Sequence, residues 1–380
     1  MMRRSFDDAV VGAGIIGLAH AYQLARRGRR VVVFERGRRA SGASVRNFGM
    51  LWPIGQPLGP RRDLAVRSLE IWAEVLRASG LWHERTGSLH LAYRDDEAQV
   101  LREFAREAGQ AGLDCDLLGP RQVLERSGAV KASRLRAGLW SPAESCVDPR
   151  EVVAGLPGWL ANEFGVHFRF ESAVAGYEHP LLIVSGQEWT ADHLYVCAGD
   201  DLQTLYPEAL ESAGLVRCKL QMMRTEPPGT SWRLGPMLAA GLTLRHYPSF
   251  ANCPSLPALK ARIAEERPEF DRYGVHVLAS QNGRGELVLG DSHEYGDAIE
   301  PFDKAEIDDL VLDYLSTFLD VPGLRIASRW HGTYAKHPEA LYYVGRPAPE
   351  VTVVTGVGGN GMTLSFGLAE RVVDESLGGP

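Results

Sequence analysis

The sequence predicts an α/β fold, and three observations lead to that prediction. An apolar strand at residues 9–11 runs into a glycine-rich turn and then a helix. A second apolar strand at residues 31–34 follows that helix, and a third at residues 351–355 runs into another glycine-rich turn. Strands that alternate with helices in this order form parallel sheets.

Length and composition fit a folded globular protein. The chain has 380 residues, of which 45% are hydrophobic and 23% charged, so disordered and fibrous classes are excluded. This length predicts two domains or one elaborate domain. The net charge of −7 provides no basic surface for nucleic acid, and we expect no nucleic-acid partner.

The cysteines, the histidines and the first residues indicate the environment of the protein. Five scattered cysteines without a C-x-x-C pair predict a reducing cytoplasm rather than a disulfide framework. Eleven histidines without paired metal-ligand spacing predict no metal site. The first eight residues lack the apolar segment of a signal peptide, and no stretch approaches the ~20 apolar residues of a spanning helix. We therefore expect a cytoplasmic protein with no membrane partner.

A G-x-G-x-x-G segment at residues 12–17 follows the first strand. Gly12 permits a tight turn, Gly14 lets the backbone approach a pyrophosphate, and Gly17 lets the next helix pack close to the sheet. The positive end of that helix favours a pyrophosphate. Glu35, at the end of the second strand, can accept hydrogen bonds from ribose hydroxyls. Together these residues predict a dinucleotide site, with a ligand-free glycine turn as the alternative.

The helix after this turn is expected over residues 18–27 and ends at Gly28, where a left-handed residue is favoured. Arg36 could meet a 2′-phosphate beyond the ribose. The neighbouring Glu35 would repel that group, which favours a solvated surface position for Arg36.

Two later segments indicate a flavin dinucleotide. Residues 41–52 place small residues before an Arg-Asn pair, and residues 356–363 form a second glycine-rich turn before a helix expected over 364–375. The second turn suits the pyrimidine edge of an isoalloxazine ring, where reduction places negative charge. A plain loop is the alternative for this turn. A nicotinamide-dependent dehydrogenase, the alternative for the protein, needs no such second turn.

These residues resemble the D-amino-acid-oxidase-like family of FAD proteins, the group that holds glycine oxidase and sarcosine oxidase. The resemblance runs through residues 8–52, 198–199 and 330–380. It implies a Rossmann-type FAD-binding domain and a second α+β substrate domain built on an antiparallel sheet. The FAD-binding domain would comprise residues 1–85, 140–215 and 325–380, and the substrate domain residues 86–139 and 216–324.

Local patterns agree with the second domain. Strands at residues 275–278 and 286–289, separated by an Asn-Gly pair, predict a β-hairpin. Residues 95–110 and 305–319 predict amphipathic helices. Residues 241–247 are expected to form a strand whose alternate side chains reach the cavity.

The resemblance implies FAD as cofactor. Relatives that attach their flavin covalently use a cysteine before the last strand, and residues 325–361 contain none, so we expect noncovalent FAD. The residues implied at the cofactor are Gly12, Gly14, Ile15, Gly17, Glu35, Arg36, Gly42, Ala43, Ser44, Arg46, Asn47, Val174, Ala198, Gly199, Gly358, Gly359, Gly361, Met362 and Thr363. Val174 would touch the adenine through its backbone.

In this family the flavin takes a hydride from the carbon beside a neutral amine nitrogen. Amino-acid oxidases hold the substrate carboxylate with Arg in a W-x-G-x-R-P segment, and here Tyr334 stands at the Arg position. A phenol lacks the charged fork of Arg, which argues against an ordinary α-amino acid. Lys336 and His337 bring cationic or donor groups instead, with surface positions as the alternative. The candidate catalytic residues are Arg46, Met50, Trp52, Tyr247, Tyr334 and Lys336.

Segments at residues 46–53, 290–295 and 334–337 together resemble one bacterial branch of the family, associated with aminophosphonate breakdown. That resemblance implies oxidation of 2-aminoethylphosphonate or its N-methyl derivative to phosphonoacetaldehyde. The expected partners are a small anionic amine as substrate and oxygen or another electron acceptor. The alternatives are a glycine, sarcosine or D-amino-acid oxidase or dehydrogenase and, in another class, a non-catalytic flavoprotein subunit.

Overall fold

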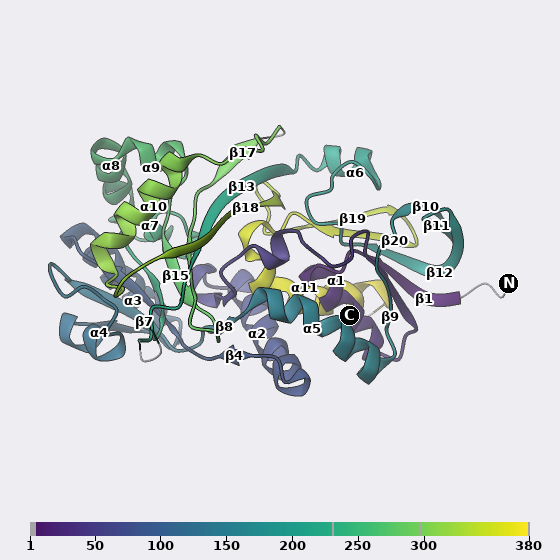
Figure 1. Cartoon of the computed structure of the whole chain (residues 1–380), viewed down its shortest axis with the longest axis horizontal. Helices are drawn as coiled ribbons and strands as arrows, with labels where there is room; N and C mark the ends of the chain where they lie inside the picture. The colour runs from purple at the N-terminus through teal and green to yellow at the C-terminus, as the bar shows by residue number, and fades with distance from the viewer. Residues whose placement is uncertain (1–4, 230–231, 297, 379–380) are drawn as a thin grey trace.

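A computed structural model describes residues 5–229, 232–296 and 298–378. Two large sheets lie side by side, each with its own helices (Figure 1). A small three-stranded sheet consists of β3 (Met50–Leu51), β8 (Ser145–Val147) and β4 (His83–Glu84). Short 3-10 turns η1 to η4 lie at Ala43–Val45, Pro53–Gly55, Pro248–Phe250 and Gly358–Asn360.

The first sheet has eight strands, and its centre is parallel. Its strands are β1 (Ser5–Val11), β2 (Val31–Phe34), β9 (His167–Arg169), β10 (Val174–Glu178), β11 (Leu181–Val184), β12 (Gln187–Val196), β19 (Tyr343–Ala348) and β20 (Val351–Thr355). Strand β1 lies between β2 and β12, and β20 joins β12, all in parallel pairs. The carboxyl ends of these strands therefore meet at one edge, where α/β folds bind ligands.

Four helices cover this sheet or pack on one another beside it. They are α1 (Ile15–Ala25), α2 (Pro60–Ser79), α5 (Pro149–Phe164) and α11 (Gly361–Ser376). Helix α1 contacts both α5 and α11, and α11 contacts α2. Trp72 of α2 and Phe366 of α11 are buried edge to face, with ring centroids 4.7 Å apart. Aromatic pairs in this geometry add stability beyond the apolar area that they bury.

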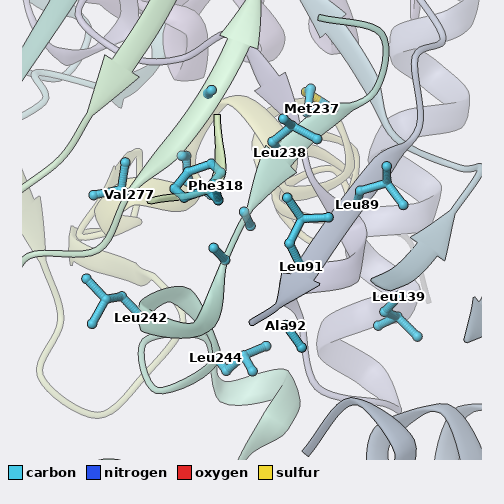
Figure 2. Close-up of a cluster of buried hydrophobic side chains, with 14 of the residues drawn as sticks. Leu89, Leu91, Ala92, Leu139, Met237, Leu238, Leu242, Leu244, Val277 and Phe318 are labelled. Atoms are coloured by element: carbon cyan, nitrogen blue, oxygen red, sulfur yellow. The ribbon is translucent and has the colours of Figure 1, made fainter. Parts of the chain in front are cut away.

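The second sheet has nine strands, paired antiparallel except for β5 with β14. Its strands are β5 (Ser88–Ala92), β6 (Asp116–Leu118), β7 (Ala137–Ser141), β13 (Val216–Thr225), β14 (Met237–Ala239), β15 (Leu278–Gln281), β16 (Leu287–Gly290), β17 (Glu294–Gly296) and β18 (Ile326–Lys336). The other helices are α3 (Asp95–Gln110), α4 (Pro120–Arg126), α6 (Pro207–Ser212), α7 (Gly241–Leu244), α8 (Leu256–Glu266), α9 (Pro268–Arg272) and α10 (Ala305–Phe318). Figure 2 shows leucines of β5, β7, β14 and α7, together with Phe318 of α10, in the buried cluster at the core of this half.

The structure confirms the predicted α/β class and most of the predicted elements. Helix α3 and strands β2 and β20 have the predicted bounds, and α10 ends one residue early. The hairpin forms, but its first strand begins at Leu278 rather than at residue 275. Strand β18, in the part predicted to bind FAD, pairs along its length with β13 of the second sheet.

The strand expected over residues 241–247 is wrong. Residues 241–244 form the helical turn α7, in which the Thr243 backbone N–H donates to Ala240 O at 2.8 Å. The Leu242 backbone N–H donates a hydrogen bond to the Tyr314 hydroxyl oxygen at 3.0 Å. A short apolar run does not distinguish strand from helix by itself, and this tertiary bond accompanies the helical turn.

Candidate cofactor and substrate cavity

A cavity of about 480 Å³ opens at the edge where the parallel strands end. Its walls come from both ends of the chain: the turn after β1, the end of β2, the segment 40–48, the ends of β12 and β20, and strands β13 and β18. Most of the residues predicted at the cofactor line it, namely Gly12, Gly14, Ile15, Glu35, Arg36, Gly42, Ala43, Ser44, Arg46, Asn47, Val174, Ala198, Gly199, Gly358, Gly359, Gly361 and Met362.

The N-terminal glycine turn leaves no room for larger residues. Gly12 has φ +98°, and a Cβ there would lie 2.4 Å from Cys197 O. A Cβ on Gly17 would lie 1.9 Å from Gly12 O, so this glycine sets the packing of α1 and does not line the cavity. The Ile15 N–H at the start of α1 donates to Ser44 Oγ at 2.9 Å.

Glu35 holds the turn together at the end of β2. Its Oε2 accepts from Ala13 N at 3.0 Å and its Oε1 accepts from Gly37 N at 2.9 Å. Each carboxylate oxygen keeps further acceptor capacity for a ribose hydroxyl. Arg36 lines the cavity but is paired with Asp201 at 2.8 Å, with its side chain 68% exposed, a solvated position as the sequence favoured.

Replacing Glu35 with lysine should weaken FAD binding by at least about tenfold, because both backbone N–H groups lose their acceptor and a cation enters the turn. The ratio of flavin to protein absorbance after gel filtration, and the Kd from flavin fluorescence, measure this. Glu163→Lys on the exposed face of α5 makes the same change of charge away from the cavity. Equal FAD retention in the two variants would contradict a role of Glu35 at the cofactor.

The C-terminal glycine turn lies between β20 and α11. Gly358 has φ +58°, and its neighbours Gly359, Gly361 and Met362 line the cavity beside it. The Trp72 indole Nε1–H donates to Met362 O at 2.8 Å, which fixes the turn to α2. Thr363 is not among the lining residues of the described chain, because its Oγ1 faces β3 and accepts from Trp52 N at 3.0 Å.

The cavity fits a flavin dinucleotide. At the α1 end, backbone N–H groups, the helix start and Glu35 offer what a pyrophosphate and a ribose require. At the α11 end, glycines without side chains leave room for a flat ring beside a second helix start. Val174, the first residue of β10, lies in the wall between Ser172, Ala173 and the end of β12.

The segment after η1 supplies polar groups to the middle of the cavity. Asn47 Nδ2 donates to Ala43 O and Ser44 O, each at 3.0 Å, which holds the turn in shape. Arg46 Nη1 donates to His331 O at 3.1 Å, which anchors the guanidinium on β18. Arg46 thus connects the cofactor segment with the strand that carries Tyr334.

Strand β18 forms the wall at the α11 end. Tyr334 lines the cavity at 8% exposure, and burial raises the pKa of its hydroxyl well above the usual value, so the phenol is neutral. Lys336 lies beside the wall: its Nζ is 3.3 Å from the Tyr295 hydroxyl, and a Cβ on Gly358 would lie 3.5 Å from its Cγ. His337 points elsewhere, because its Nδ1 accepts from the backbone N–H groups of Glu339 and Ala340.

Four predicted catalytic residues are not among the residues that line the cavity in the described chain: Lys336, which lies beside its wall, and Met50, Trp52 and Tyr247. Trp52 is 4% exposed and packs against His90 and Tyr247, with ring centroids 5.3 and 6.3 Å away. Its backbone N–H is held by Thr363, which turns the indole toward the core of the second sheet. Met50 and Trp52 belong to the hydrophobic core of the second sheet, and Tyr247 packs against that core.

Asp291 is a cavity residue that the sequence did not single out. It follows β16, is 5% exposed and lines the wall near Tyr334, Leu220 and Met222. The polar segment 290–295 had marked the region, but no pattern distinguished this carboxylate. Behind it lie His246, His276 and His293, whose ligand atoms come within 4.8 Å of one another.

The three imidazoles stack rather than converge. The ring planes of His276 and His246 differ by 22°, and those of His276 and His293 by 17°. A shared metal ion needs in-plane nitrogen lone pairs that point at one position, which near-parallel stacked rings do not provide. Absence of a metal therefore stays a prediction. No helix in the described ranges combines the length and apolarity required to cross a bilayer.

A family model described as FAD dependent oxidoreductase matches residues 7–375. A glycine oxidase of Geobacillus kaustophilus is 28% identical over 52% of this chain and 55% of its own length. The bifunctional tRNA-modifying protein MnmC of Maricaulis maris is 24% identical over 98% of this chain and 52% of its own length. The chain thus spans about half the length of these two relatives. A glycine oxidase of Bacillus licheniformis is 23% identical over the whole chain and 95% of its length.

Solved structures share the fold across the whole chain. An L-proline dehydrogenase from P. horikoshii superposes with a TM-score of 0.80 at 20% identity, covering 100% of this chain and 95% of its own. The Geobacillus kaustophilus glycine oxidase superposes with a TM-score of 0.78 at 19% identity, covering 99% of this chain and 96% of its own. At these identities the likeness concerns the fold.

Proposed function

Because this chain belongs to the family of FAD-dependent oxidoreductases and has FAD as its cofactor, we propose that it oxidises the C–N bond of a small anionic amine. The substrate we propose is 2-aminoethylphosphonate or its N-methyl derivative, with phosphonoacetaldehyde as the product. The observation that carries the proposal is the wall at the α11 end. It presents the neutral Tyr334 with Arg46 and Lys336 nearby, instead of one Arg aimed at a carboxylate.

A phosphonate dianion has three oxygens and a tetrahedral shape. Separate donors from different strands and turns suit it better than a single planar fork. The Tyr334 hydroxyl, the Arg46 guanidinium and the Lys336 ammonium are donors of this kind. Lys336 lies above the Tyr295 ring at 5.0 Å from its centroid, which holds the ammonium beside the wall.

The remaining lining residues exclude water and orient the amine. Leu220 and Met222 of β13 are buried at 6% and 1% exposure and present apolar surface to the cavity. FAD, when bound, supplies the hydride acceptor. The apolar side chains limit water around the reacting carbon, and the donors at β18 fix the anionic end of the substrate.

Oxidation of glycine or sarcosine is the second candidate. Two relatives are named glycine oxidases, and one of them aligns with the whole chain. In that reaction Arg46 would meet the carboxylate, because its guanidinium is bonded to β18, whereas Arg36, the other arginine that lines the cavity in the described chain, is paired with Asp201.

An anaerobic flavin-reduction screen across amino acids, N-methylated amines and aminophosphonates tests the proposal. We expect 2-aminoethylphosphonate or its N-methyl derivative to bleach the flavin absorbance faster than glycine or sarcosine does. Faster reduction by glycine or sarcosine would favour the second candidate. Failure of every amine would favour a non-catalytic flavoprotein. Reoxidation of the reduced protein by air then tests oxygen as acceptor.

Lys336→Ala should raise the apparent Kd for the aminophosphonate about tenfold, because one charged donor to the anion is lost. The substrate dependence of the flavin reduction rate measures this Kd. Lys131→Ala is the matched control, since Lys131 Nζ donates to Ser316 O of α10 and Lys131 is not among the described residues that line the cavity. An unchanged Kd in Lys336→Ala would remove this residue from the substrate site.

A further inference from the structure

We propose that Asp291 is the base that takes a proton from the substrate ammonium group, and that the histidines behind it lead this proton to an outer groove. The inference rests on the proposed amine oxidation and deepens it. An amine bound as its ammonium form cannot give up a hydride, because its nitrogen has no free electron pair. The cavity therefore needs a group that accepts this proton away from bulk water.

Asp291 has the position for this role. Glu35, Asp200 and Asp201 line the other end of the cavity with Arg36, whereas Asp291 lies with Tyr334, Leu220 and Met222. Among the lining residues described, it is the carboxylate at that end. Its Oδ1 lies 3.0 Å from His276 Nε2, and its Oδ2 lies 3.9 Å from His293 Nε2.

The contacts of the two imidazoles indicate which ring nitrogens can exchange a proton, and Asp291 Oδ1 is itself buried without a hydrogen-bond partner in the described chain. His293 Nδ1 is 3.0 Å from Gly274 O, which only accepts, so Nδ1 carries the hydrogen of the neutral ring. His293 Nε2 then presents a lone pair toward Asp291. Burial lowers the pKa of His293 to about 4, so this ring is neutral at pH 7. His276 Nδ1 is buried without a hydrogen-bond partner, which leaves one ring nitrogen free to exchange a proton.

The same cluster reaches a second cavity. His246 and His276 line an outer groove together with Lys260, Asp271 and Gly274. The ring of His246 stacks on that of His276 with centroids 3.8 Å apart, and His246 is exposed. One contact, between Asp291 and His276, thus separates the substrate cavity from a groove that is open to solvent.

Other titratable groups surround Asp291 and its histidines. The titratable groups that face it or its histidines from the neighbouring elements are Cys218 of β13, Arg245 and Tyr247 after α7, Tyr295 of β17, and Tyr334 and Lys336 of β18. Burial raises the pKa of the Cys218 thiol to about 12 and raises those of the tyrosines, so these groups stay neutral. Desolvation also lowers the pKa of His246 well below its usual value, so His246 and His293 are both neutral at pH 7.

The step moves one proton and no electrons. The ammonium N–H bond breaks and its electron pair stays on the nitrogen, while an O–H bond forms on the Asp291 carboxylate. The proton then passes to the imidazoles and leaves through His246. The amine is left with the lone pair that C–N oxidation requires, and nothing is oxidised or reduced in this step.

The pH dependence of flavin reduction tests the inference in the FAD-loaded enzyme with 2-aminoethylphosphonate under anaerobic conditions. We expect the ratio of the limiting rate to Kd to change less than about threefold between pH 7.5 and 9.5 in the wild-type protein. In Asp291→Asn it should be about 100-fold lower at pH 7.5. It should then rise about tenfold per pH unit, because only free amine reacts and the ammonium pKa is roughly 10.

Two further variants complete the test. Asp313→Asn makes the same side-chain change on the exposed surface of α10 and should follow the wild-type profile. His276→Gln keeps an amide donor for Asp291 but cannot carry a proton. It should lower the rate about tenfold at pH 7.5, with recovery on addition of imidazole.

Parallel profiles of Asp291→Asn and wild type would overturn the inference and leave the proposed function intact. If the ratio of the limiting rate to Kd rises tenfold per pH unit in the wild-type protein, the inference is also overturned and the proposed function stands. This outcome needs no folded Asp291→Asn protein. If no amine reduces the wild-type flavin, both proposals fall. About one transition-metal ion per chain in the purified protein would also overturn it, since ligated imidazoles cannot pass a proton.

Discussion

Gly17→Ala should yield a protein that retains less than about a tenth of its FAD and loses about 3 kcal/mol or more of its free energy of unfolding. The new Cβ would lie 1.9 Å from Gly12 O and 3.1 Å from Gly12 C, both backbone atoms. Gly12 already has φ +98°, and a Cβ built on it would lie 2.4 Å from Cys197 O. The turn therefore has no space into which it could move away from the new methyl group. Either α1 separates from β1 or the turn enters the cofactor space.

Flavin absorbance per chain and urea unfolding measure the two effects of this substitution. Gly158→Ala is the matched control, because a Cβ at this position of α5 meets nothing within 4 Å. In a helix interior that change should stabilise the protein by about 0.5–1 kcal/mol. A Gly17→Ala protein with full FAD content would show that the contact between α1 and the turn relaxes without cost to the site.

Trp72→Ala should lower the free energy of unfolding by about 3–5 kcal/mol and speed the release of FAD. Trp72 is fully buried, packs edge to face on Phe366, and donates its indole N–H to Met362 O at 2.8 Å. Its removal leaves a cavity between α2 and α11 and frees the glycine turn that Met362 belongs to. Urea unfolding and the rate at which free-FAD fluorescence appears after dilution of the FAD-loaded protein report the two effects.

Trp72→Phe separates packing from hydrogen bonding. The smaller ring keeps most of the contact with Phe366 but removes the indole N–H from Met362 O, which still accepts from Ser365 Oγ at 3.2 Å, so the cost should be about 0.5–1.5 kcal/mol. We expect FAD release to quicken in both variants if the hydrogen bond positions the turn. Faster release in Trp72→Ala alone would assign the effect to packing.

The dinucleotide site was predictable because its requirements are local. A tight turn, a helix start and an acidic residue follow one another within the first 35 residues, and the family match confirms the resemblance drawn from them and from the second glycine turn. Gly17 packs α1 against the turn, as its place in the motif predicted, whereas Thr363, expected at the cofactor, holds the Trp52 backbone. A motif predicts which residue type a position needs, but only the folded structure shows which atoms that residue contacts.

The substrate side was less predictable, because its residues meet only through long-range pairing. Asp291 reaches the cavity because β16 pairs with β13, and His276 reaches Asp291 because the segment before β15 runs alongside. Trp52 looked like a cavity residue from its place after the Arg-Asn pair. The backbone bond to Thr363 sets its position, and no sequence period reports a bond across 311 residues.

The joining of the two glycine turns has a consequence for biosynthesis. At about 5–20 residues per second, the ribosome needs roughly 15–65 s to proceed from Glu35 to Met362. For about the first half of that interval β1 lacks its neighbour β12, and until its end β12 lacks β20 and α1 lacks α11. Nascent chains therefore expose apolar surface that neither flavin nor late helices can yet cover, and protection by chaperones during translation should govern the yield of active protein.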